Sequence, residues 1–162
     1  MDLARYTALF LSDSRDHLQR CNELLLAWER APADHAPVAE LFRALHSIKG
    51  SSAALGLEAI AELSHSAEQV LSAVRDGSLP SSREVLDGLF RAVDGLGDGL
   101  EAVVRGEPPV ADRALIAVLL ALAPQQGRSA GEIPIGERRR LEREAEPAGA
   151  PDHQRRRLGL GP

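Results

Sequence analysis

The 162-residue sequence has one cysteine, one methionine and only 3% aromatic residues. A single cysteine excludes any disulfide within the chain and favours a reducing compartment. Long apolar runs are also missing: residues 114–123 form the longest uncharged apolar stretch, well short of the about 20 residues that span a bilayer. The first 18 residues carry charges in every turn and do not resemble a secretory signal. These absences predict a cytoplasmic protein without membrane insertion.

Positive charge is scarce over most of the chain. Residues 1–124 contain 11 Lys and Arg against 18 Asp and Glu, whereas residues 125–162 contain 8 arginines against 6 acids. Because phosphate contacts need a positive field, the acidic part argues against nucleic acid as a partner. The arginine runs 138–140 and 155–157 stand among glutamates, which is typical of a solvated tail.

Alternating runs of β-branched residues, the pattern of strands, do not occur either. Apolar residues instead recur at helical spacing, as in the second segment's stripe of Val38, Leu41, Phe42, Leu45 and Ile48. The predicted helices span about residues 2–29, 36–56, 57–76, 81–105 and 113–123. Short connections between them favour an all-α fold, an up-down antiparallel four-helix bundle with a fifth short C-terminal helix.

Several local signals place the ends and faces of these helices. The first helix should bury one broad face, made of Tyr6, Phe10, Leu18, Cys21, Leu25 and Trp28. Gly77 should stop the third helix. Ser81 and Glu84 match a Ser-x-x-Glu capping box at the start of the fourth, and four glycines within that helix mean that packing must hold it. Residues 124–162 have no apolar periodicity, so we expect a domain over residues 1–123 and a linker or disordered tail beyond it.

His46 is the residue with the strongest functional signal. It points about 95° away from the mean direction of its helix's apolar stripe, so the ring should reach water. A neutral imidazole is a competent nucleophile near pH 7. Lys49 and Gly50 follow at three and four positions and adjoin it on the helix surface. A lysine offsets the charge of an incoming phosphate, and a glycine lets another protein approach. The pattern predicts that His46 carries a phosphoryl group between two partner proteins.

The third helix offers candidates for the hydrogen bond that would hold the other ring nitrogen of His46. His65 and Glu68 are three residues apart and lie on one face of that helix. The same two residues could instead be an exposed polar pair with no role at His46.

Residues 43–56, Arg-Ala-Leu-His-Ser-Ile-Lys-Gly-Ser-Ser-Ala-Ala-Leu-Gly, resemble the phosphohistidine box of HPt (histidine phosphotransfer) domains. The run His-Ser-Ile-Lys-Gly is similar to the phosphotransfer domains of CheA-type chemotaxis kinases, and the likeness covers about residues 1–123. The resemblance implies that His46 is the phosphoacceptor, that Lys49 lies beside the phosphate and that Glu68 pairs with the imidazole. It further implies His65 as a nearby modulator and a partner-docking surface formed by Arg43, Gly50 and Ser51.

The same resemblance implies the partners. A histidine kinase domain would phosphorylate His46 from ATP with Mg²⁺, both held by that partner, and an aspartate of a response-regulator receiver domain would then take the phosphoryl group. No ATP-binding fold is recognisable in this sequence, so we expect the chain to be the substrate of a kinase domain in a longer polypeptide or in another protein, and to bind no cofactor itself.

Two other classes of function are compatible with a helical bundle. A non-catalytic adaptor would bind a partner helix, with His46 merely exposed. A carboxylate-bridged metal enzyme would use the Glu62-x-x-His65 unit, but such sites need a second copy on a facing helix, and the sequence has none. Because that second copy is missing, we expect no metal site.

The glycines at 95, 97 and 99 suggest a phosphate-binding loop. They follow no strand and fall within a helical pattern, however, which argues against such a loop.

Overall fold

The structure, a computed structural model, describes residues 2–123, and these residues form five helices. The helices are α1 (Leu3–Arg30), α2 (Ala36–Ala54), α3 (Glu58–Arg75), α4 (Arg83–Val104) and α5 (Arg113–Leu122). No strand occurs in residues 2–123, which confirms the predicted all-α fold and all five helices. The predicted tail, with its arginine runs, lies outside the described residues.

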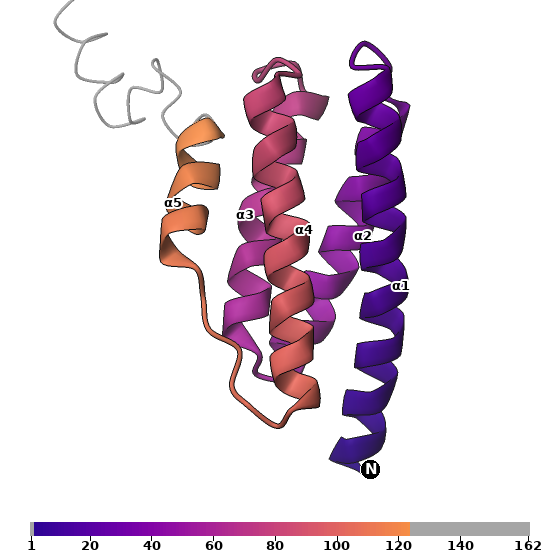
Figure 1. Cartoon of the computed structure of the whole chain (residues 1–162), viewed down its shortest axis with the longest axis vertical. Coiled ribbons are helices and arrows are strands. Elements are labelled where there is room, and N and C mark those ends of the chain that lie inside the picture. The colour runs from indigo at the N-terminus through magenta and orange to yellow at the C-terminus, as the bar shows by residue number, and fades with distance from the viewer. Residues whose placement is uncertain (1, 124–162) are drawn as a thin grey trace, which may run out of the picture. The chain divides into compact units, whose positions relative to one another are not determined.

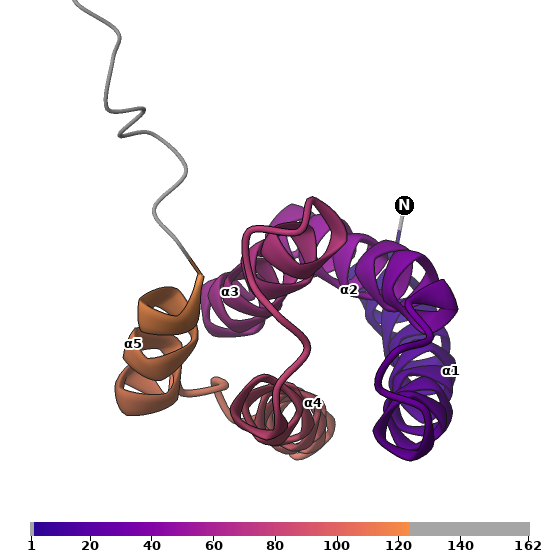
Figure 2. The same cartoon turned by 90° about the horizontal axis from the view of Figure 1, so that it is seen from above.

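The first four helices form an up-down antiparallel bundle (Figure 1). In sequence order each packs on the next, and α4 returns to pack on α1, so the four helices enclose one core. α5 packs on the outside, against α3 and α4, as the end-on view shows (Figure 2). None of the five has the length and apolar character that a membrane-crossing helix needs. The arrangement sets α2 and α3 side by side along most of their length.

Helix ends are determined by side-chain caps and by glycines. Asp112 accepts a hydrogen bond from the backbone N–H of Leu115 at 2.9 Å and starts α5. α3 ends before Gly77, as predicted, and the φ of this residue is +81°, a value that glycine adopts without strain. The predicted capping box at Ser81 is wrong by one residue, because Ser82 is the N-cap of α4 and accepts from Val85 at 3.2 Å. The Ser81 hydroxyl instead lies 3.0 Å from His35 Nε2.

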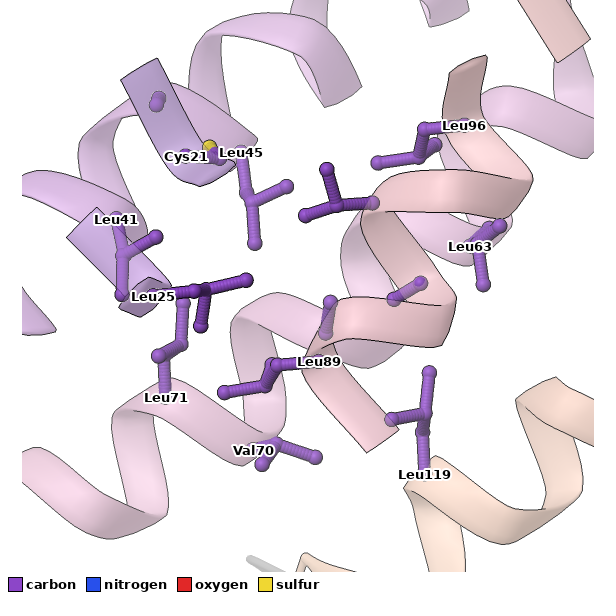
Figure 3. Close-up of a cluster of buried hydrophobic side chains, with 14 of the residues drawn as sticks. Cys21, Leu25, Leu41, Leu45, Leu63, Val70, Leu71, Leu89, Leu96 and Leu119 are labelled. Atoms are coloured by element: carbon purple, nitrogen blue, oxygen red, sulfur yellow. The ribbon is translucent and has the colours of Figure 1, made fainter. Parts of the chain in front are cut away.

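The core consists mostly of leucine, valine, isoleucine and alanine side chains, with Phe10, Cys21 and Trp28 of α1 among them. Figure 3 shows members of this cluster from all five helices, among them Leu25, Leu45, Leu71, Leu96 and Leu119. Trp28 is fully buried and donates its indole N–H to the Pro32 carbonyl at 3.3 Å.

Tyr6 is not part of this core, contrary to the prediction, since it is 42% exposed. The reason is length. α1 has 28 residues and α2 has 19, so their axes measure about 42 Å and about 28 Å at 1.5 Å per residue. The first turns of α1 therefore extend past its neighbour (Figure 1).

The glycines of α4 let it approach its neighbours closely. A Cβ atom at Gly95 would lie 3.0 Å from Leu63 Cδ2 of α3, and one at Gly99 would lie 3.0 Å from Ile60 Cγ1. A Cβ atom at Gly97 would meet nothing within 4 Å. A Cβ atom at Gly88 would lie 3.3 Å from Leu119 Cδ2 of α5. Three of the four glycines thus have a packing role, which explains how a helix of weak intrinsic propensity is maintained.

This difference predicts opposite effects for two alanine substitutions. Gly97→Ala should raise the free energy of unfolding by about 0.5–1 kcal/mol, because alanine favours the helix and the space is open. Gly99→Ala should lower it by about 1 kcal/mol, because the stiff β-branched Ile60 cannot easily move away. Urea denaturation of the two variants measures both changes, and equal stabilisation by both would show that Gly99 has no packing role.

Candidate functional site

His46 lies in the middle of α2 at the edge of its buried face. Its neighbours Leu45 and Ile48 are 1% and 0% exposed, whereas the His46 side chain is 61% exposed. Residues that point into the core therefore hold the backbone on both sides of the histidine. The ring itself is accessible to another protein, as the helical spacing predicts.

One nitrogen of the His46 ring contacts a carboxylate from the neighbouring helix. His46 Nδ1 lies 3.0 Å from Glu68 Oε1 of α3. An ionised carboxylate only accepts hydrogen bonds, so in the neutral imidazole Nδ1 carries the hydrogen and donates it. The lone pair then belongs to Nε2, the nitrogen at the far side of the ring from Glu68. This tautomer is the one a nucleophile at Nε2 requires.

Lys49 completes the cluster from the same helix as His46. Its Nζ donates a hydrogen bond to Glu68 Oε1 at 3.0 Å and lies 2.8 Å from Oε2, so the ammonium forms an ion pair with the carboxylate in which Oε1 accepts the hydrogen bond. Its side chain is only 26% exposed, so the ammonium group has little freedom to move away from Glu68. Lys49 follows His46 by three residues, which places its positive charge one helical turn from the imidazole. His46, Lys49 and Glu68 therefore form one hydrogen-bonded group across α2 and α3.

The charge of Glu68 is maintained despite burial. The residue is 8% exposed, and loss of water alone would raise the pKa of its carboxyl group. Hydrogen bonds from Lys49 and then His46 lower the pKa and outweigh burial, so the pKa of Glu68 lies below its usual value. Glu68 is thus an anion at neutral pH, able to stabilise positive charge that develops on the ring.

His65 is not brought to His46. It is exposed on α3, and its Nε2 lies 2.8 Å from Nε2 of Gln69, one turn further along its own helix. Glu62, the other half of the Glu-x-x-His unit, forms an ion pair with Arg113 of α5 at 2.8 Å. Within residues 2–123 no group of three or more His, Cys, Asp and Glu side chains is placed to hold a metal ion.

The three residues that are predicted to form a docking surface all face outward. Arg43, Gly50 and Ser51 are exposed, and a Cβ atom at Gly50 would meet nothing within 4 Å. Packing inside the bundle therefore gives no reason for glycine at that position.

Phe42 is a neighbour of the site that the sequence analysis assigned only to the core. It is half-buried, and its ring stacks on the His46 ring. The spacing of four residues between them was the signal, since i and i+4 side chains meet on a helix.

Known proteins with a similar sequence or fold are phosphotransfer proteins. The model of the family described as "Hpt domain" matches residues 5–106. The chemotaxis protein CheA of Bacillus subtilis is 41% identical over 106 residues, which cover 65% of this chain and 16% of that protein. The CheA of Listeria monocytogenes is 34% identical over 104 residues, or 64% of this chain and 17% of that protein. The chain thus spans about a sixth of the length of these relatives.

Solved structures show the same bundle. The phosphorylated P1 domain of CheA3, in complex with CheY6, from R. sphaeroides has a TM-score of 0.68 and 30% identity, covering 74% of this chain and 98% of that one. The CheA phosphotransferase domain from Thermotoga maritima has a TM-score of 0.60 and 30% identity, covering 64% and 98%. The family model extends over most of the helical region and includes His46, and the chain belongs to the Hpt domain family.

Proposed function

We propose that this domain acts in chemotaxis-type two-component signalling, with His46 receiving a phosphoryl group from a CheA-type histidine kinase domain and passing it to a receiver-domain aspartate. The observation that carries the proposal is the exposed imidazole whose Nδ1 is held by the buried carboxylate of Glu68. ATP and Mg²⁺ belong to the kinase partner. Because the reaction consumes ATP, we place it in the cytoplasm.

The bonds balance in both steps. The Nε2 lone pair of His46 forms the new bond to the γ-phosphorus of ATP, and the bond from that phosphorus to the bridging oxygen breaks as ADP leaves with the electron pair. The ring becomes cationic, with Nδ1–H donated to Glu68, whose negative charge stabilises it. In the second step an aspartate oxygen attacks the phosphorus, the P–N bond breaks, and its electron pair returns to Nε2.

The residues of this chain mainly position the nucleophile. Glu68 fixes the tautomer and the ring direction, and Lys49 supplies positive charge one turn from the incoming phosphate. A charge pair at 4 Å in an environment of effective dielectric near 20 is worth about 4 kcal/mol. Holding Nε2 in line with the phosphorus lowers the activation barrier, because the reacting atoms no longer have to find the correct orientation by chance.

Phosphorylation by a kinase core tests this function. The purified protein, incubated with a CheA-type kinase core and labelled ATP, should acquire label that is stable in base and lost in acid, because phosphohistidine is acid-labile. Addition of a receiver domain should then remove the label from this chain. A CheA phosphotransfer domain serves as the positive control for the kinase core. Acid-stable label, or none while the control is labelled, would overturn the proposal.

Gly50 is proposed as the close-approach point for both partners, with Arg43 and Ser51 beside it. Gly50→Leu should keep the fold, because the space above it is open, yet its side chain would stand one turn from His46. We expect the rate of phosphorylation to fall on the order of tenfold, equivalent to about 1.4 kcal/mol of lost docking. Gly97→Leu, at an open position on α4, is the matched control, and an equal fall in both variants would remove Gly50 from the docking surface.

A further inference from the structure

The ring of Phe42 lies against the phosphoacceptor. Phe42 precedes His46 by one turn of α2, the two ring centroids are 6.1 Å apart and the ring planes differ by 14°. This separation and near-parallel orientation are those of an offset-stacked pair. Phe42 is half-buried and packs on the core cluster, so its ring has little freedom to turn.

A charged group from the next helix holds this phenylalanine. Arg75, the last residue of α3, places its guanidinium carbon 4.4 Å from the centre of the Phe42 ring. A guanidinium at this distance is attracted to the face of an aromatic ring. Phe42 is therefore held from two sides, by the core beneath it and by Arg75.

The exposed histidine needs such a support. Its hydrogen bond to Glu68 restrains Nδ1, but a hydrogen bond tolerates considerable misalignment, so the ring can still rock about its Cβ–Cγ bond. A parallel ring alongside restricts the tilt of the imidazole plane. Since Nε2 lies at the opposite end of the ring, a small tilt moves the direction of its lone pair, on which in-line attack depends.

We infer that Phe42 is a positioning residue for phosphoryl transfer: its ring sets the plane of the His46 imidazole, and Arg75 holds Phe42 in place. The inference rests on the proposed function of His46. It assigns Phe42 no contact with the phosphoryl group. Glu68 and Phe42 thus divide the task, the carboxylate fixing the tautomer and the phenyl ring fixing the plane.

The test compares four variants in two measurements. Phe42→Leu removes the flat face but keeps apolar volume, and Phe42→Tyr restores the face. Phe90→Leu is the matched control, because Phe90 is also half-buried against the core but lies on α4, which does not pack on α2. Arg75→Gln alters an exposed side chain, so it serves if Phe42→Leu does not fold.

The first measurement is the rate of phosphorylation by a kinase core. Phe42→Leu should lower it about threefold to tenfold, the range expected for one lost aromatic pair, and Arg75→Gln about twofold. Phe42→Tyr and Phe90→Leu should retain the wild-type rate. The second is the NMR spectrum of the unphosphorylated protein, in which the Phe42 ring current should displace the His46 ring-proton resonances. That displacement should disappear in Phe42→Leu and persist in Phe42→Tyr and Phe90→Leu.

The two measurements separate the inference from the function on which it rests. If the wild type accepts no phosphoryl group, the proposed function fails, whatever the spectra show. If the wild type is phosphorylated and Phe42→Leu matches it in rate, the positioning role is overturned. It is also overturned if Phe90→Leu loses as much rate as Phe42→Leu, or if Phe42→Tyr does not recover it.

Discussion

His46→Gln should accept no measurable phosphoryl group from a kinase core that labels the wild type. Glutamine has a similar size and polarity, but its amide nitrogen has no lone pair available for attack on phosphorus. We expect the rate to fall by about 10³-fold or more, as when a nucleophile that no other group can replace is removed. Phosphorimaging of the labelled protein after electrophoresis measures the loss.

The fold should not respond to this substitution. The His46 side chain is 61% exposed, and substitutions at such positions usually change the free energy of unfolding by less than about 0.5 kcal/mol. His65→Gln is the matched control, since His65 is also exposed on the bundle but makes its hydrogen bond to Gln69. Label on His46→Gln equal to that on His65→Gln would place the phosphoacceptor elsewhere.

The helices could be predicted from the sequence because each carries its own signal. Apolar spacing identifies every helix, and Gly77 marks the end of α3 through its local backbone geometry. The prediction of Ser81 as the N-cap of α4, where the structure has Ser82, failed for a reason that is not local. Either serine can cap α4 by its residue type. Ser82 does so because Val85, whose backbone N–H donates to the Ser82 hydroxyl, must also place its side chain in the core.

The candidate site was only partly predictable, since the rotation of one helix against another is not a local property. The spacing along α2 brings Lys49 to His46, but it does not say which of His65 and Glu68 faces them. In the structure Glu68 faces α2 and is buried, whereas His65, three residues earlier, points to solvent. The stacking of Phe42 was missed because its place in the apolar stripe accounts for it as a core residue, although its spacing of four residues from His46 allows the two side chains to meet.

The close contacts of α4 were hidden for a related reason. Its glycines show in the sequence only as weak helix formers. That Gly95 and Gly99 face Leu63 and Ile60, while Gly97 faces open space, depends on how α4 is rotated against α3. Packing between helices therefore decides whether a glycine allows a close contact or only weakens the helix.

Glu68→Gln should slow phosphorylation of His46 about 10- to 100-fold. The glutamine oxygen can still accept from Nδ1, but it lacks the negative charge that stabilises the ring when Nε2 attacks. Hydrogen bonds to charged groups contribute about 1.5–3 kcal/mol, which corresponds to this range of rates. Single-turnover phosphorylation by a kinase core at saturating ATP measures the effect, with Glu62→Gln, an exposed carboxylate on the same helix, as the matched control.

The same variant should reveal the contribution of Glu68 to stability through its pH dependence. Hydrogen bonds from Lys49 and His46 keep the pKa of Glu68 in the folded protein below its usual value, so the folded state favours the ionised form. This stabilisation is fully present above the unfolded pKa of about 4.3 and is lost as pH falls through the lower, folded value. Urea denaturation should therefore show Glu68→Gln less stable than wild type at pH 7, with the gap narrowing below about pH 4.

The two effects of Glu68→Gln have separate causes and can fail separately. A slow variant with a constant stability gap from pH 7 to pH 3 would mean that Glu68 acts on the ring without being held as an anion by Lys49. A variant phosphorylated at the wild-type rate would mean that the hydrogen bond at Nδ1, seen at 3.0 Å, has no part in attack. Equal slowing of Glu62→Gln would point to the general acidity of α3, because that residue touches neither His46 nor Lys49 and pairs instead with Arg113.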